Sequence, residues 1–369
     1  MTNKNEIYTP TEGNVKKAEN MMTDEQKEAS EIRSENYEQE QPPWEDFSEK
    51  IDENFIRKPP SSEAIEKMDK SLEELGQVFD GSNSNWHLDG ALNISLMNNE
   101  YIGEHKDVDI SVEKDELEAI EAHLLKNGYG FFLSQTEDKS QNKIMRRVDF
   151  KDFNDSDNEH MLIAAIDENG KIRRDKSLNF VDVHIINRNE EGTALSILET
   201  PLPEKWTQPQ PMEFHGKQIN LSHPGKVLYY KLHQGRDYDA TDAIKLIETG
   251  KITEEDIDDI QKVHEEEFSS SIDRGSKIFN NIAGLINSDM NTDEIFNAMQ
   301  NQPEFKKRGD MDEGLKKLAE KISESDDKSS DNMLNTAIIM FGVEEKNNQE
   351  RQNLSELRQR VKDAQKLKK

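Results

Sequence analysis

The 369-residue chain contains 77 Asp and Glu against 48 Lys and Arg, which gives a formal net charge of −29. Only 32% of its residues are hydrophobic, so we expect one well-packed domain flanked by acidic, helix-rich or disordered parts. This acidity argues against broad binding to a nucleic-acid backbone, and the lack of cysteine excludes disulfides and Cys-based zinc sites. No stretch approaches the ~18 apolar residues of a membrane span, and the N-terminus lacks an apolar signal core, so we expect a cytoplasmic protein.

Residues 1–60 are predicted to form a disordered acidic arm, because they are polar, repetitively charged and broken by two Pro-Pro pairs. Their Trp and Phe side chains are Trp44, Phe47 and Phe55. The alternative is a short segment that docks these aromatic residues on a partner protein. The C-terminal charged region offers a second possible contact with a protein partner.

Residues 61–200 have the pattern of an α/β domain. A helix is expected from Ser61 or Ser62, with Gly76 near its end, because Met68, Leu72 and Leu75 have helical spacing. Further helices are expected over Asp89–Met97 and Asp115–Lys126. Strands are predicted over Gly130–Leu133, Ile144–Phe150, Met161–Ile166 and Phe180–Ile186, with a hairpin turn at Asp167–Gly170 and a loop over Lys151–Glu159.

Two aspartates lie in a segment in which polar and apolar residues alternate, Asp107-Val108-Asp109-Ile110. In a strand, Asp107 and Asp109 would share one face while Val108 and Ile110 anchor the other in a core. Adjacent carboxylates repel, and a divalent cation removes this repulsion, with Mg²⁺ preferring such oxygen ligands. The alternative from these residues alone is a solvated edge strand.

A third aspartate, Asp182, lies within the apolar strand Phe180–Ile186, where it shares a face with Phe180 and His184. Burying a carboxylate requires a compensating partner. If the two strands are neighbours, Asp182 becomes a third oxygen donor for the same cation; otherwise it faces water on an edge strand.

The remainder of the chain is predicted to be mainly helical. Residues 201–250 form a segment that completes the substrate or nucleotide site, with one strand over Met212–Leu221 and helices from Pro224 and Ala240. Residues 251–369 form a charged helical C-terminal region, in which the apolar stripes are interrupted near Ser323–Asp331. Lys231 and Arg236 could neutralise the charge of a metal-bound triphosphate, or could be ordinary surface cations.

These residues together resemble the nucleotidyltransferase superfamily with the DNA polymerase beta-like minimal fold, and are most similar to aminoglycoside and lincosamide adenylyltransferases. The resemblance covers roughly residues 80–250 and rests on the glycine turn with its following helix, the Asp-x-Asp strand and the third aspartate. It also includes Trp86, His105 and the Phe180–His184 strand. It implies a mixed β-sheet with flanking helices, followed by a helical C-terminal region.

The resemblance implies a cytoplasmic enzyme that transfers an NMP from an NTP, such as ATP, to an acceptor hydroxyl and releases pyrophosphate. The catalytic and metal-binding residues would be Asp107, Asp109 and Asp182, holding two Mg²⁺ ions; the nucleotide-binding residues would be Gly90, Ala91, Lys231 and Arg236. The acidity favours a small molecule or a protein over RNA as the acceptor.

Two departures from the superfamily pattern motivate alternatives. The superfamily pattern has a Gly-Gly or Gly-Ser pair that opens a helix. If Asp89-Gly90 aligns with this pair, Asp89 replaces its first glycine; if Gly90-Ala91 aligns with it, the serine is missing. Gly103 stands where these enzymes often carry an arginine. Both changes remove phosphate contacts. The alternatives are therefore a catalytically silent nucleotidyltransferase-like binding module and an acidic interaction protein.

Overall fold

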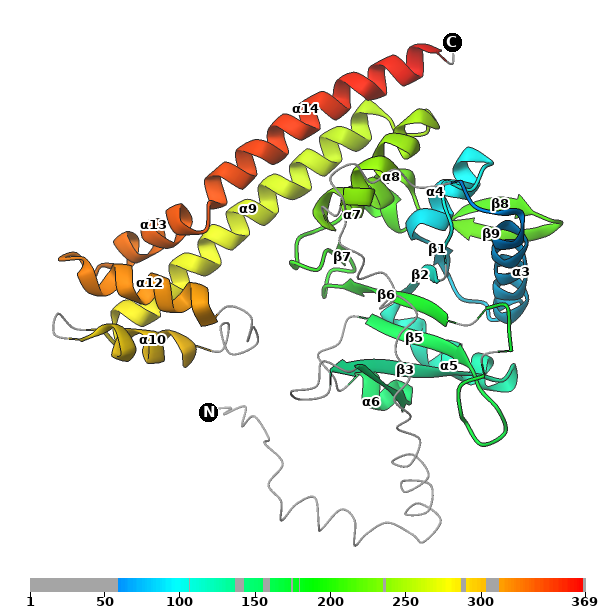
Figure 1. Cartoon of the computed structure of the whole chain (residues 1–369), viewed down its shortest axis with the longest axis horizontal. Coiled ribbons are helices and arrows are strands. Elements are labelled where there is room, and N and C mark those ends of the chain that lie inside the picture. The colour runs from blue at the N-terminus through cyan, green and yellow to red at the C-terminus, as the bar shows by residue number, and fades with distance from the viewer. Residues whose placement is uncertain are drawn as a thin grey trace, which may run out of the picture. The chain divides into compact units, whose positions relative to one another are not determined.

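The computed structural model describes residues 59–105, 107–136, 143–154, 160–173, 175–178, 180–234, 237–286, 290–302 and 312–367. The predicted arm over residues 1–60 lies outside these ranges apart from Pro59 and Pro60. The chain divides into two compact units (Figure 1). The sheet unit comprises the described residues of Met1–Ile186, Pro209–Ser222 and Arg236–Asp242, and the helical unit those of Asn187–Gln208, His223–Gly235 and Ala243–Lys369.

The sheet unit is built on a mixed β-sheet with the strand order β4-β3-β5-β6-β2-β1-β9-β8. β2 and β6 run parallel and β1 pairs antiparallel with β2, while β3, β4, β5 and β6 form antiparallel neighbours. The predicted mixed α/β fold is thereby confirmed. The strand bounds are β1 His87–Leu88, β2 Val108–Glu113, β3 Tyr129–Thr136, β4 Lys143–Val148, β5 His160–Ala165, β6 Phe180–Arg188, β8 Gln210–Phe214 and β9 Lys217–Leu221.

Three longer helices accompany the sheet, α3 (Ser62–Phe79), α4 (Gly90–Asn98) and α5 (Leu117–Lys126). The Ser61 side chain caps α3 by accepting a hydrogen bond from the Ala64 amide, as the sequence predicts. Met68, Leu72 and Leu75 are buried, and the helix continues through Gly76 for three more residues. The sheet unit therefore keeps the apolar periodicity seen in its sequence.

Two local predictions in the sheet unit were wrong. The expected loop over Lys151–Glu159 begins within a short helix, α6 (Phe150–Asn154), because Asp149 accepts the Asp152 amide and Phe153 is buried. The single strand expected over Met212–Leu221 is the hairpin β8–β9. It reverses at His215 and Gly216, whose φ angles of 48° and 74° suit a two-residue hairpin turn.

The helical unit is organised around one 30-residue helix, α9 (Glu254–Ala283), which begins at a capping box formed by Thr253 and Asp256. The sequence predicted separate helical pieces here, but no proline interrupts the run and the helix continues through Gly275. The last helix, α14 (Val343–Leu367), lies along α9 and buries Leu354 and Val361 (Figure 1). The unit also contains β7 (Ala194–Leu195), α7 (Pro224–Gln234), α10 (Thr292–Gln300), α12 (Asp312–Glu324) and α13 (Ser330–Met340).

α8 (Asp237–Glu248) is divided between the two units. A separate apolar cluster joins the far end of α9 to α10, α12 and α13 through Phe279, Ile295, Leu318 and Met333. No helix within the described ranges combines the length and hydrophobicity needed to cross a membrane.

Candidate active site

The site is built where two parallel strands place aspartates at the same level of the sheet. Asp109 on β2 is directly paired in register with Asp182 on β6. Val108 and Ile110 flank Asp109 and are buried, with 3% and 0% of their surface exposed. Because side chains alternate along a strand, burial of these two residues turns Asp109 to the opposite face, alongside Asp182. The strands that carry Asp109 and Asp182 are thus neighbours, which is the condition that the sequence analysis set for Asp182 to join Asp109.

His184 joins these two aspartates. It follows Asp182 by two residues on β6, and its Nε2 lies 4.0 Å from Asp182 Oδ2. One ligand atom from each of Asp109, Asp182 and His184 lies within 4.8 Å of the other two. The two carboxylates fit a divalent cation, because the ion offsets their mutual repulsion and carboxylate oxygens suit Mg²⁺ or Mn²⁺.

Asp89 faces the interior of the sheet unit, where only 5% of its surface is exposed. The Ser111 hydroxyl donates a short hydrogen bond to Asp89 Oδ2. The same oxygen lies 3.6 Å from His184 Nδ1. Asp89 thus interacts with Ser111 and His184, and the carboxylate that replaces a glycine of the superfamily pattern has partners of its own.

The charge of the site acts on His184. Burial lowers the pKa of the His184 imidazole, but its hydrogen bond to Asp89 and the negative charges of Asp182 and Asp109 outweigh this effect and raise the pKa to about 9. The imidazole is therefore held in its charged form near neutral pH by the surrounding carboxylates.

Gly90 allows α4 to begin directly against Asp109. Its φ is +63°, and a Cβ at this position would lie 1.9 Å from Asp109 Oδ2. The Asp89 amide also donates to the Asp109 carbonyl over 2.8 Å, which joins the turn to β2. The first amides of a helix have no partner within the helix and carry a partial positive charge, which favours anionic groups at this end of α4.

The other residues predicted for the site are distributed over both units. Asp107 precedes β2 by one residue and is not a member of the three-residue group around Asp182, so its role as a ligand stays a prediction. Ala91 is buried in the first turn of α4. Lys231 is buried on α7 in the helical unit, and Arg236 lies outside the described residues. Their nucleotide-binding roles also stay predictions.

His184 is the member of the group to which the sequence argument assigned no ligand role. The sequence signal that could have identified His184 is its spacing from Asp182, because residues two positions apart in a strand lie on the same face of the sheet. A histidine on a sheet face is common without any metal, and only the pairing of β6 with β2 shows that His184 lies beside two carboxylates.

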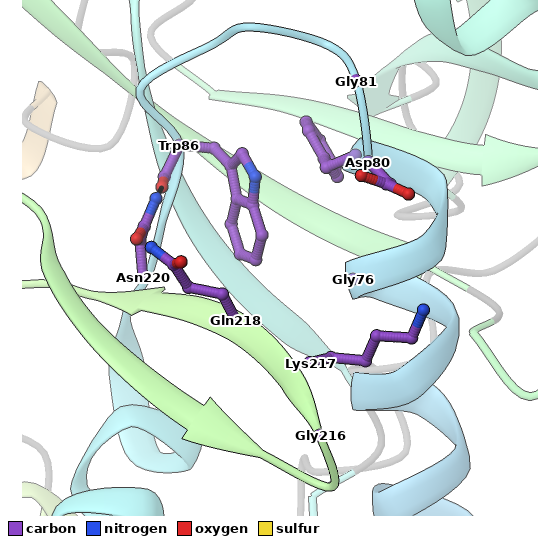
Figure 2. A pocket seen from close by; sticks show the side chains of 9 residues that line it. Gly76, Asp80, Gly81, Trp86, Gly216, Lys217, Gln218 and Asn220 are labelled. Atoms are coloured by element: carbon purple, nitrogen blue, oxygen red, sulfur yellow. Dashed lines mark hydrogen bonds between the residues drawn. The ribbon is translucent and has the colours of Figure 1, made fainter.

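A pocket of about 270 Å³ also occurs in the sheet unit (Figure 2). It lies between the end of α3 and the β8–β9 hairpin and is lined by Phe79, Asp80, Trp86, Lys217, Gln218 and Asn220, together with three glycines. Asp109, Asp182 and His184 are not among its lining residues. We therefore place the candidate active site at Asp109 and Asp182, which the paired strands bring together.

The mixed sheet and the paired aspartates fit the resemblance to nucleotidyltransferases that the sequence predicts. Residues 71–170 match the family described as Aminoglycoside-2''-adenylyltransferase, which confirms the resemblance predicted from the sequence. The matched segment contains Gly90, Asp107 and Asp109 and ends before Asp182. No curated protein sequence was matched by the chain.

Solved structures of nucleotidyltransferases were also matched. The lincomycin-bound lincosamide antibiotic adenylyltransferase LnuA is 15% identical, over 51% of this chain and 98% of that one, with a TM-score of 0.31. An antigenic nucleotidyltransferase-like protein from Paracoccidioides brasiliensis is 15% identical, over 52% and 78%, with a TM-score of 0.28. The antibiotic-resistance factor ANT(2'')-Ia is 10% identical, over 56% and 95%, with a TM-score of 0.35.

Proposed function

We propose that this protein is a Mg²⁺-dependent nucleotidyltransferase that transfers an NMP from an NTP to a hydroxyl of a small cationic acceptor. The observation that carries the proposal is the side-by-side placement of Asp109 and Asp182 on β2 and β6, with His184 beside them. The family match over residues 71–170 supports the reaction class. The name of that family, together with the net charge of −29, supports an aminoglycoside-like acceptor and ATP as the donor.

The reaction requires positioning and charge neutralisation more than covalent help from the protein. Asp109 and Asp182, with Asp107, would hold two Mg²⁺ ions, which when bound would neutralise the triphosphate and lower the pKa of the acceptor hydroxyl. The acceptor oxygen attacks the α-phosphorus, the bond from phosphorus to the bridging oxygen breaks, and pyrophosphate leaves. Asp182 accepts the hydroxyl proton as general base.

Other residues of this chain bind or position the phosphates of the NTP. Gly90 leaves space for close approach to the backbone, and the first amides of α4 favour negative charge. Lys231 and Arg236 are assigned to the triphosphate or to the leaving pyrophosphate. Asp89 orients His184 beside Asp182 through their shared contacts.

The test is incubation of the purified full chain with each α-labelled NTP, Mg²⁺ and a panel of aminoglycosides, lincosamides, proteins and tRNA. We expect pyrophosphate release and an acceptor that gains the mass of one NMP. Asp109→Asn and Asp182→Asn should each lower turnover by about 10²–10⁴-fold. Asp175→Asn, which removes an exposed carboxylate paired with Arg173, is the matched control and should leave turnover unchanged.

The remaining outcomes contradict the proposal. Nucleotide binding without turnover on any acceptor indicates a silent binding module, and the absence of any nucleotide binding indicates an acidic interaction protein. Turnover that survives Asp182→Asn would remove the general-base role from that residue.

A further inference from the structure

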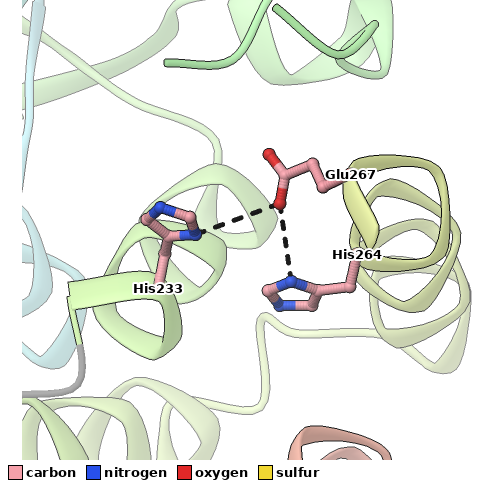
Figure 3. Close-up of side chains that lie close together, drawn as sticks. All are labelled: His233, His264 and Glu267. Carbon is pink, nitrogen blue, oxygen red and sulfur yellow. Dashed lines mark ion pairs between the residues drawn. The ribbon is translucent and has the colours of Figure 1, made fainter. Parts of the chain in front are cut away.

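Three potential metal ligands meet in the helical unit, outside the candidate active site. His264 and Glu267 are three residues apart on α9 and therefore lie on one face of that helix. His233 reaches them from α7 (Figure 3). One ligand atom from each of the three lies within 4.8 Å of the others.

The two oxygens of Glu267 have different surroundings. Oε1 accepts a 2.8 Å hydrogen bond from the Ser196 hydroxyl and a short one from the Tyr229 hydroxyl. Oε2 faces His264 Nδ1 at 3.7 Å and His233 Nδ1 at 3.9 Å (Figure 3). Both distances exceed the 2.7–3.2 Å of an N–H···O hydrogen bond. The space between Oε2 and the two imidazoles is thus not closed by direct hydrogen bonds.

The Glu267 side chain is buried, and hydrogen bonds from neighbouring side chains orient its carboxylate. Its side chain is only 6% exposed. Its Oε1 accepts hydrogen bonds from the Ser196 and Tyr229 hydroxyls. Outer hydrogen bonds of this kind orient a metal-binding carboxylate, and Ser196 and Tyr229 supply them here. The rings of His264 and His233 both pack against Tyr229, with centroids 5.5 and 5.7 Å away.

We propose that His233, His264 and Glu267 bind a Zn²⁺ ion that links α7 to α9. Two imidazoles and one carboxylate are a ligand set that Zn²⁺ uses, whereas Mg²⁺ prefers oxygen ligands throughout. His233 is 30% exposed, so the fourth coordination position faces solvent and takes water.

The experiment uses the full chain, stripped of metal with a chelator, reloaded with Zn²⁺, desalted and analysed by elemental mass spectrometry. We expect one Zn²⁺ per chain, a rise in Tm on loading, and a tetrahedral absorption spectrum with Co²⁺. His233→Ala and His264→Gln should lose the ion and the Tm response, and circular dichroism checks that both variants fold. His215→Ala, which removes an imidazole that is 49% exposed, is the matched control and should retain Zn²⁺.

Two further variants sharpen the assignment. Tyr229→Phe removes one hydrogen bond to Glu267 and should lower the Zn²⁺ affinity by about 10-fold without abolishing binding. Asp182→Asn should leave Zn²⁺ content unchanged, because the active-site group is separate from these residues. Failure of the wild-type chain to bind Zn²⁺, its retention by both histidine variants, or its loss on Asp182→Asn alone would overturn the proposal while leaving nucleotidyl transfer untouched.

Discussion

At the scale of single residues, neighbours in space decide what a motif residue does. Asp89 replaces a glycine of the superfamily pattern, and its charge could repel incoming phosphates. Its carboxylate instead accepts a hydrogen bond from the Ser111 hydroxyl and pairs with the His184 imidazole. The identity of these partners depends on strand pairing, so the motif alone could not predict the environment of Asp89.

Gly90→Ala should reduce both stability and turnover. The new Cβ would lie 1.9 Å from Asp109 Oδ2, and the φ of +63° is unfavourable for any other residue. We expect about 1–3 kcal/mol of backbone strain and a displaced Asp109, measured by denaturant unfolding and by NTP turnover.

The control is Gly216→Ala in the β8–β9 turn. This glycine also has a positive φ, of +74°, but no atom lies within 4 Å of its added Cβ. It should show the strain and keep full turnover. Equal turnover of the two variants would mean that the close approach to Asp109 is unimportant.

At the scale of elements, single side chains attach α3 to the strand β3. Glu74 on α3 accepts a 2.7 Å hydrogen bond from the Tyr129 hydroxyl through Oε1 and a 3.1 Å bond from the Leu178 amide through Oε2. Lys176 adds an ion pair at 3.1 Å. Burial raises the pKa of Glu74, but these contacts outweigh it and hold the pKa below its ordinary value of 4.5.

Glu74→Gln should therefore destabilise the protein in a pH-dependent way. A lowered folded-state pKa contributes stability above the unfolded value of about 4.5, and this stability is lost as the pH falls through the folded-state pKa. We expect a loss of about 1–3 kcal/mol at pH 7 that shrinks below pH ~4.5, measured by urea unfolding. Glu66→Gln, on the same helix with an exposed partner, Lys70, is the control and should leave stability almost unchanged, because solvent screens this pair. A pH-independent difference for Glu74→Gln would contradict the ionic role.

At the scale of the whole molecule, the net charge of −29 should influence which acceptors are captured. A strongly acidic protein attracts cations by long-range steering, which salt screens within about 8–10 Å at physiological ionic strength.

The kcat/KM for an aminoglycoside acceptor should accordingly fall by about 10-fold between ~10 mM and ~150 mM salt. Turnover of a neutral polyol acceptor under the same conditions is the control and should vary much less. A salt response equal for both acceptors would indicate that the overall charge does not guide acceptor binding.

The sequence by itself determined the local elements and the candidate carboxylates. Alternating residues around Asp109 and Asp182 predicted strands with one buried face, and both strands are present, because period-two burial is encoded in adjacent residues. The glycine turn at Gly90 and the cap at Ser61 are local in the same sense. The hairpin at residues 210–221 and the continuous α9 differed from expectation, because backbone conformation at His215 and packing along α9 are not readable from apolar spacing.

Only the tertiary structure decided which side chains meet. The parallel pairing of β2 with β6 brings Asp109 beside Asp182 and His184, although Asp109 and Asp182 are 73 positions apart in the sequence. The meeting of His233 with His264 and Glu267 likewise depends on how α7 lies against α9. These pairings are driven by the burial of apolar faces. The free energy of this burial comes from whole helices and strands, so a short sequence motif cannot predict which elements pair.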